Sequence, residues 1–333
     1  MTDCAIAGFG WWGNYLAGRL AHSKSMRVGV IVEPSAERAA SARAAGFRTV
    51  DHLDVALADN GIDAVILTTP NELHEVQVIA AAAAGKHVFC EKPLGLTKAS
   101  AQRSVAACRK ARVVLGIGHE RRFEPPMIEV RRLIETGALG TVMHAESNFS
   151  HDKLINVPKG DWRRDPASAP AAGMTGMGVH LTDLYISMFG RVSTVTALTA
   201  DRVLGWETGD VVTVQLGFEA GMTATLSAIL KTPHFVRYQV FGSDAWVEVR
   251  SAPHRDAPGG DAELLLQRSG AEPVREHFPM ADTVSANLDA FAAAISGKSC
   301  YPYTDEQLIH NIEILEAVAE SARARTIIHL ARE

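Results

Sequence analysis

The sequence predicts an α/β protein with two parts: a doubly wound parallel sheet, then an α+β domain with a large, mostly antiparallel, open-faced sheet. Over residues 4–118, short apolar runs rich in Val and Ile alternate with segments whose apolar residues have helical spacing. This alternation is typical of parallel strands buried on both faces. After residue 122 the strand-like runs have a period of two and are separated by Gly, Asp, Ser and Pro, which indicates antiparallel pairing. A chain of 333 residues also exceeds what one ordinary core requires.

The individual elements follow from these patterns. Five apolar runs of the first part are expected to be strands: CAIAGFG, RVGVIVE, DAVILTT, KHVFCE and RVVLGIG. In the second part, a strand from TVMHAESNFSH precedes six further strand-like runs between 192 and 268. Helices are expected over 126–136, 179–189, 283–296 and 305–323. The predicted domains are 1–121 and 122–333, with a C-terminal helix able to pack back on the first domain.

Composition narrows the classes of function. The formal net charge of -5 argues against nucleic acid or an anionic membrane as a partner. The four cysteines form no CxxC pair and no cluster with zinc spacing. We therefore expect reduced thiols in a cytoplasmic protein, and we expect no metal site. The chain enters a strand almost at once without a basic leader, and its longest apolar stretches are interrupted by Gly or charge. We therefore expect neither a signal peptide nor a membrane span.

A glycine motif between the first strand and the first helix predicts dinucleotide binding. GFGWWG places Gly8, Gly10 and Gly13 where a tight turn lets backbone N–H groups approach a pyrophosphate, and the following helix adds positive charge at its N-terminus. The alternative is a plain structural turn, which the strand–turn–helix context disfavours. Trp11 and Trp12 either form a wall of the cofactor site or pack against the next domain, and the sequence does not separate these two interpretations.

The acid that ends the second expected strand favours NAD over NADP. Glu33 stands 20 residues after Gly13 and would accept hydrogen bonds from the adenosine ribose hydroxyls. A 2′-phosphate at that point would meet like charge, and Arg38 is the nearest cation in the sequence. The alternative interpretation of Glu33 is a solvated strand end.

Two polar segments follow later strands, at the edge where ligands of a doubly wound sheet bind. TTPNELH covers residues 68–74, and CEKP covers residues 90–93. Near a nicotinamide ring, Lys92 could hydrogen-bond a substrate hydroxyl and stabilise a developing alkoxide. The alternative is a solvated lysine in a surface turn.

These segments bring out a resemblance to the Gfo/Idh/MocA family of oxidoreductases, over nearly the whole chain. The most specific shared string is AAGKHVFCEKPL, joined by GHERRFEP, GDWRRDP and GMGVHLTDL. The resemblance implies that Lys92 contacts both cofactor and substrate hydroxyl, that Pro93 shapes the turn, often with a cis peptide bond, and that Glu91 lies along the nicotinamide ribose. It also implies a loop beside the cofactor, formed by Thr69, Pro70, Asn71 and His74.

The family motif D-x-G-x-H-x-x-D is present only in part. His180 and Asp183 match its last two positions, which implies that His180 is the catalytic base and that Asp183 contacts substrate or orients the histidine. Their spacing of three also places them on one face of a helix. Gly176 stands where the family has its first Asp. Two alternatives follow: a substrate other than an ordinary hexose or inositol, which is favoured, or weak or lost catalysis. Met174 and Met177 are expected to make the pocket more apolar than a sugar site usually is.

Further polar residues are expected to face the substrate. Arg122, in GHERRFEP, could pair with a substrate carboxylate; the alternative for the arginines of this segment is a salt bridge with Glu120 or Glu124. The family has a WRxDP segment that lines the substrate, and Trp162 and Arg163 match it. His234 and Tyr238 are weaker candidates, and His151 with Asp152 form no pattern that we can interpret.

The sequence thus predicts an NAD-dependent dehydrogenase or reductase acting on CH–OH groups of a small sugar-, polyol- or cyclic-diol-like molecule. One alternative is a glycosidase-like enzyme that reduces its NAD only transiently, and another is a non-catalytic NAD-binding regulator. Domain 1–121 is thus expected to bind the dinucleotide, and domain 122–333 to bind substrate and to oligomerise. We expect a homodimer or homotetramer, because a second copy would cover the open face of a sheet that has alternate apolar residues.

Overall fold

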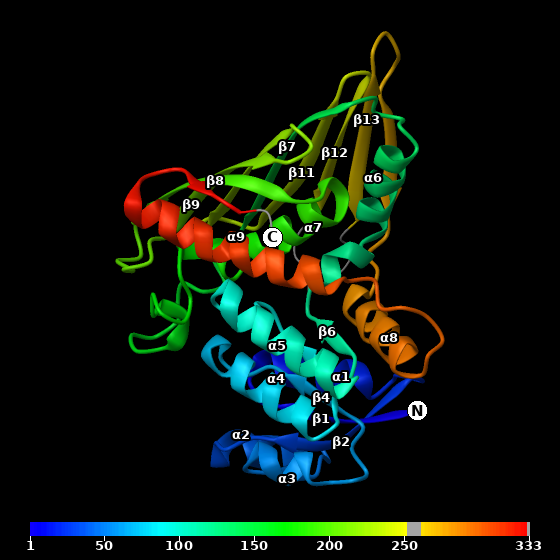
Figure 1. Cartoon of the computed structure of the whole chain (residues 1–333), viewed down its shortest axis with the longest axis vertical. Coiled ribbons are helices and arrows are strands. Elements are labelled where there is room, and N and C mark those ends of the chain that lie inside the picture. The colour runs from blue at the N-terminus through cyan, green and yellow to red at the C-terminus, as the bar shows by residue number, and fades with distance from the viewer. Residues whose placement is uncertain (252–260, 332–333) are drawn as a thin grey trace. The chain divides into compact units, whose positions relative to one another are not determined.

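The computed structural model describes residues 1–251 and 261–331, and these fall into two compact units. The first unit consists of Met1–Glu120 and Asp282–Ile312, and the second of the described parts of 121–281 and 313–333. Each unit has a sheet of its own (Figure 1). The expected fold class is confirmed: one sheet is parallel with helices around it, and the other is mostly antiparallel. The functional division into domains at residues 121 and 122 stays a prediction.

The first unit contains a six-stranded parallel sheet in the order β3-β2-β1-β4-β5-β6. Its strands are β1 Thr2–Ala7, β2 Met26–Val32, β3 Thr49–Val50, β4 Ala64–Leu67, β5 His87–Cys90 and β6 Leu115–Ile117. Its helices are α1 Trp11–Leu20, α2 Ala36–Ala44, α3 Leu53–Leu57, α4 His74–Ala83, α5 Lys98–Ala111 and α8 Thr283–Ile295, with a 3-10 turn at Asn71–Leu73. All four residues of β4 are buried, because helices cover both faces of the sheet.

The second unit contains a nine-stranded sheet in the order β14-β13-β12-β11-β7-β10-β9-β8-β15. Its strands are β7 Val142–Ser150, β8 Val192–Ala200, β9 Val211–Phe218, β10 Thr223–Ile229, β11 Phe235–Gly242, β12 Ala245–Ser251, β13 Ala262–Arg268, β14 Val274–Phe278 and β15 Ile328–His329. The helices are α6 Pro125–Glu135 and α7 Gly178–Phe189, with short turns at Glu120–Phe123, Trp162–Arg164 and Ala172–Met174. Helix α9, Asp305–Ala324, begins in the first unit and ends in the second.

The alternation along β9 separates the two faces of this sheet. Val212, Val214 and Leu216 are buried in the core of the unit, whereas Thr213 and Gln215 are exposed. The alternate apolar residues that suggested a second copy therefore face the unit's own core. Register places Phe241 opposite both Trp246 and His144, on the same face as Gln215, so the outer face combines polar side chains with a few large rings.

Candidate active site

The glycine loop of the first unit depends on close approach between backbone segments. Gly8 has φ +93, and a Cβ on Gly13 would lie 2.0 Å from the Gly8 carbonyl oxygen and 2.8 Å from Thr68 Oγ1. The Thr68 hydroxyl lies 3.0 Å from the Ala7 oxygen and 2.9 Å from the Gly8 oxygen, so it holds the loop from the end of β4. Gly10 caps helix α1, and a Cβ there would meet nothing within 4 Å. The loop thus leaves an open helix N-terminus, as a pyrophosphate site requires.

Glu33 lies at the end of β2 and binds the glycine loop. Its carboxylate accepts hydrogen bonds from the N–H of Phe9 at 2.7 Å and of Ser35 at 2.9 Å, and from Arg38 Nη2 at 3.0 Å. Burial alone would raise the pKa of Glu33, but the hydrogen bonds from Arg38, Phe9 and Ser35 outweigh it and lower the pKa below its usual value. Glu33 is therefore a buried carboxylate held in place, and the solvated strand end is excluded.

Trp11 and Trp12 stack with Tyr15 along the first turns of α1. The Trp12 and Tyr15 ring centroids are 5.0 Å apart with nearly parallel planes, and those of Trp11 and Trp12 are 5.3 Å apart. Trp11 is 66% exposed, whereas Trp12 is half-buried, and its indole lowers the pKa of the Glu91 carboxyl group. Trp12 therefore lies near the Glu91 carboxyl group, which directly follows β5.

Glu91 is a buried carboxyl group beside Lys92. Burial first, and then the charge of Glu120, raise its pKa to about 7, against the opposing effects of Trp12 and Lys92. A Cβ on Gly118, the residue after β6 that pairs with Cys90, would lie 2.3 Å from Glu91 Oε2. Only glycine at 118 therefore leaves room for this carboxyl group, a requirement that the sequence alone did not indicate.

The raised pKa of Glu91 predicts a specific pH dependence of folding for the cofactor-free protein. Below about pH 4.5 both states are protonated, and between there and about pH 7 the unfolded state is ionised while the folded state keeps its proton. Stability should fall as pH rises through this window, by about 3 kcal/mol from this group. Urea unfolding of wild type and Glu91→Gln from pH 5 to 8 checks this; parallel stability curves would contradict it.

His74 joins the two loops that follow β4 and β5. Its Nδ1 lies 2.7 Å from the Pro93 carbonyl oxygen and its Nε2 lies 3.0 Å from that of Thr69. Burial lowers the pKa of His74, and the two carbonyl oxygens oppose this. The side chain is 1% exposed, so it supports the loop of Thr69 and the turn of Lys92 from behind. The Lys92–Pro93 peptide bond is cis, as the resemblance implied, and Lys92 itself is half-buried.

Removing the His74 imidazole is expected to weaken cofactor binding through these loops. His74→Ala should lower stability by about 1–3 kcal/mol, because the buried carbonyl group that accepts the imidazole N–H loses its donor and the ring leaves a cavity. The dissociation constant for the dinucleotide should rise by about tenfold. His74→Gln, which keeps an amide donor, should recover part of the lost cofactor affinity. Intrinsic fluorescence measures stability in a urea titration and cofactor affinity in a dinucleotide titration. His22→Ala, at an exposed position, is the control. Unchanged cofactor affinity in a folded His74→Ala protein would refute the role in cofactor positioning.

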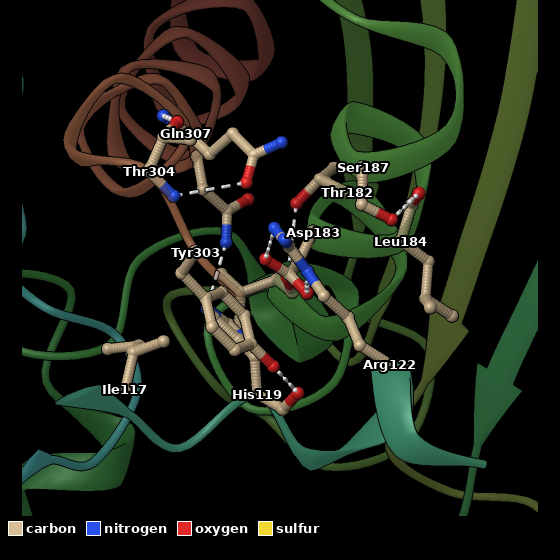
Figure 2. Close-up of polar contacts among 12 residues, drawn as sticks. Ile117, His119, Arg122, Thr182, Asp183, Leu184, Ser187, Tyr303, Thr304 and Gln307 are labelled. Atoms are coloured by element: carbon tan, nitrogen blue, oxygen red, sulfur yellow. Dashed lines mark hydrogen bonds and ion pairs between the residues drawn. The ribbon is translucent and has the colours of Figure 1, made fainter. Parts of the chain in front are cut away.

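His119 is held in the first unit at the end of β6. Tyr303 Oη donates to the His119 carbonyl oxygen at 2.5 Å (Figure 2), and Asn311 Nδ2 lies 3.0 Å from its Nε2. The side chain is 2% exposed. His119 therefore fixes the segment that leads to the two arginines.

Arg122 and Asp183 form a buried ion pair inside the second unit (Figure 2). Nε donates to Oδ2 at 2.8 Å and Nη2 to Oδ1 at 2.6 Å, with side chains 5% and 2% exposed. Both oxygens of Asp183 thus bind one guanidinium group. Neither the helical spacing nor the resemblance indicated this pairing, and the predicted roles of both residues toward substrate stay predictions.

Arg121 pairs with Glu124, as one alternative for this segment expected. Nη1 lies 2.9 Å from Glu124 Oε1, and the guanidinium carbon lies 4.1 Å above the centroid of the Phe149 ring. Phe149, in β7, was not singled out in the sequence. Its position under Arg121 depends on the register of the sheet, which sequence patterns do not give.

His180 lies in the first turn of α7 and is 6% exposed. Its ring centroid is 6.2 Å from that of Phe149, and His151 and His234 contact the same ring at 5.6 and 6.3 Å. His151, for which no pattern was found, therefore belongs to the surroundings of His180. Met174 and Met177 are 0% and 1% exposed and belong to the hydrophobic core, so their contribution to an apolar pocket is not what the structure shows.

Trp162 and Arg163 form a short turn in the loop that precedes α7. The Arg163 guanidinium carbon lies 4.3 Å from the centroid of the Trp162 ring, and its Nη1 lies 3.2 Å from Asp161 Oδ1. Arg163 is exposed and Trp162 is half-buried. Their expected contact with substrate stays a prediction.

The described residues contain neither a cluster suited to a metal ion nor a membrane-spanning helix. Across 1–251 and 261–331, no group of three or more His, Cys, Asp or Glu side chains could hold a metal ion. Within the same ranges, no helix is long and apolar enough to cross a membrane.

Comparison with known proteins defines the class of the molecule. Residues 2–119 match an oxidoreductase family model with an NAD-binding Rossmann fold, and residues 127–248 match the GFO/IDH/MocA C-terminal domain. D-xylose 1-dehydrogenase (NADP(+)) 2 of Haloferax volcanii is 32% identical over 280 residues, which is 82% of each chain. The scyllo-inositol 2-dehydrogenase (NADP(+)) IolW of Bacillus subtilis is 25% identical over 303 residues, 84% of this chain and 82% of that protein.

A solved structure agrees with these matches. Aldose-aldose oxidoreductase from Caulobacter crescentus, complexed with glycerol, has a TM-score of 0.86 at 26% identity and covers 99% of both chains. The protein is therefore an NAD(P)-dependent oxidoreductase of the dehydrogenase and reductase class, as the sequence predicted. It belongs to the Gfo/Idh/MocA family.

Proposed function

We propose that the protein is an NAD-dependent dehydrogenase that moves hydride between C4 of the nicotinamide and a secondary alcohol carbon of a sugar-, polyol- or cyclic-diol-like molecule. The observation that carries the proposal is the Glu91-Lys92-Pro93 turn, at the carboxyl end of β5 and tied by His74 to the loop after β4. A lysine at this edge of a dinucleotide-binding sheet suits a group that acts on substrate oxygen. The names of the xylose and inositol dehydrogenases support a polyhydroxylated substrate.

In the proposed reaction, Lys92, His180 and Glu91 act together with the bound dinucleotide. The bound dinucleotide supplies the hydride acceptor. Lys92 hydrogen-bonds the substrate hydroxyl and stabilises the charge that develops on its oxygen, while His180 accepts the hydroxyl proton. Glu91 binds the nicotinamide ribose. Carbonyl reduction follows the same path in reverse.

We assign the remaining contacts in two groups. The proposed cofactor contacts are Gly8, Gly10, Trp11, Trp12, Gly13, Glu33, Thr69, Pro70, Asn71 and Pro93. His74 acts in cofactor binding through the loops that it joins. The proposed substrate side consists of Arg122, Trp162, Arg163 and Asp183, with Arg122 and Asp183 acting as a pair.

NAD is the proposed cofactor, although two relatives have NADP(+) in their names. The buried Glu33 carboxylate would repel a 2′-phosphate, while its partner Arg38 would attract one. We expect kcat/KM to favour NAD by at least about tenfold, and Glu33→Ala to narrow or reverse this ratio. Arg38→Ala is the matched control, which should reduce only the activity with NADP. Steady-state kinetics with both cofactors decides, and a wild-type preference for NADP would contradict the assignment.

We also propose a homodimer or homotetramer in which the outer face of the large sheet, with Phe241 and Trp246, meets a second copy. Light scattering after gel filtration of wild type and Trp246→Glu tests this. A wild-type monomer would contradict it. We also propose a cytoplasmic location, because the four cysteines are free thiols.

The function is tested by NADH absorbance in a panel of free sugars, inositols, glycosides, sugar acids and cyclic dihydrodiols. Wild type should oxidise at least one class, and Lys92→Ala and His180→Ala should abolish that activity. Glycoside cleavage without net NADH would replace the proposal by the transient-oxidation reaction. Cofactor binding with no chemistry on any class would favour a regulator.

A further inference from the structure

Three imidazole rings surround one phenylalanine in the second unit. His151 directly follows β7, and His234 directly precedes β11. Because Ser150 pairs with Phe235 in antiparallel register, the next residues, His151 and His234, stand opposite each other. Both rings meet Phe149 edge-on, with interplanar angles of 74° and 76°, and His180 from α7 contacts the same ring. Both His151 and His234 are half-buried, so substrate could reach them.

The imidazole cluster, defined as His151, His180 and His234, contributes several N–H donors beside charges that largely balance one another. Two nearby carboxylates are each bound to an arginine: Asp183 to Arg122, and Glu124 to Arg121. Asp152, beside His151, is exposed. The guanidinium group of Arg121, which pairs with Glu124, lies above the shared Phe149 ring. Imidazole N–H and guanidinium groups are donors, and their best partners are anionic oxygens.

Gly176 removes a further negative charge from the same stretch of chain. The resemblance implies an Asp at this position, whereas Gly176 carries no carboxylate. A Cβ on Gly176 would meet only Leu154 Cδ1, at 4.0 Å, so space does not exclude a larger residue. The difference therefore changes the charge of the substrate side rather than relieving a clash.

We propose that the substrate carries a carboxylate, and that His151 and His234 bind it beside His180. This rests on the proposed function, because it takes His180 to face the reacting carbon. The carboxylate would replace, as an acceptor, the protein carboxylate that Gly176 lacks. His151 and His234 thereby determine specificity for a sugar acid over the corresponding neutral sugar.

The test compares binding of D-glucuronate and D-glucose to the full chain saturated with NADH, by isothermal titration calorimetry at low salt. The acid is expected to bind at least tenfold more tightly, and added salt to reduce this difference. His151→Asn and His234→Asn should each weaken glucuronate binding at least fivefold and change glucose binding less than twofold. His144→Asn is the matched control, since its imidazole lies on the other face of β7, 2.8 Å from Thr223 Oγ1.

A second variant separates charge from loss of fold. Gly176→Asp should weaken glucuronate binding at least tenfold and strengthen glucose binding, and melting temperatures identify any variant that is unfolded. The proposal is overturned if glucose binds as tightly as the acid, if the acid does not bind at all, or if neither histidine variant weakens it. Lys92-dependent oxidation of neutral sugars with no preference for acids would leave the proposed function standing and remove this inference. Tight acid binding without hydride transfer would leave this inference standing and remove the proposed function.

Discussion

Replacing Lys92 by alanine is expected to lower kcat/KM by about a thousandfold or more. In the proposed reaction Lys92 is the donor that stabilises the substrate oxygen as its proton leaves, and loss of such a donor costs about 10²–10³ in rate, with proton-transfer defects adding to this. Cofactor affinity should change far less, because the glycine loop, Glu33 and Thr68 are untouched. Lys92→Arg, which keeps the charge, should recover only part of the activity, since its planar group has a different geometry.

The matched control for this substitution is Lys110→Ala, an exposed lysine in the last turn of α5. It should behave as wild type in initial-rate assays with any substrate from the panel. If Lys92→Ala retains more than about a tenth of wild-type kcat/KM, Lys92 is not the group that acts on the oxygen.

Breaking the Arg122–Asp183 pair is expected to have the largest effect on stability. Asp183→Ala would leave the guanidinium group of Arg122 buried, with its partner lost, which costs about 3–5 kcal/mol. The double variant Arg122→Met, Asp183→Leu removes both charges and should recover most of this loss. Chemical denaturation of the three proteins measures the effect, and a loss below about 1 kcal/mol in Asp183→Ala would contradict the buried pair.

The same double variant separates structure from catalysis. If the pair also contacts substrate, as the resemblance implies for Asp183, the restored protein should remain at least about tenfold less active. Wild-type activity in the stable double variant would show that the pair serves only the fold.

Much of the fold could be predicted because its signals are local. The glycine motif, the buried runs and the helices over 179–189 and 283–296 depend on spacing within single segments, and the structure has α7 and α8 there. The strands β3 and β15 were not expected, because each has two residues and carries no pattern. β14 was not expected either, because its sequence VREHF is mostly polar and exposed and lacks the alternation of a half-buried strand.

Only part of the candidate site could be predicted from the sequence, for the same reason. Lys92 and Glu33 stand in segments whose motifs are contiguous, so their positions followed from the sequence. The Arg122–Asp183 pair joins residues 61 positions apart, and the imidazole cluster depends on the register of β7 and β11. Met174 and Met177 were misread because a helix-entry loop gives no sign of which side chains turn into the core.

The central claim is that hydride passes from a substrate carbon to the nicotinamide under the action of Lys92 and His180. The most direct measurement is a single-turnover reaction with substrate deuterated at the reacting carbon, followed by NMR of the recovered dinucleotide. We expect deuterium at C4 of the nicotinamide for wild type and none above background for Lys92→Ala or His180→Ala. Substrate conversion with no deuterium at C4, or transfer that persists in both variants, would contradict the account.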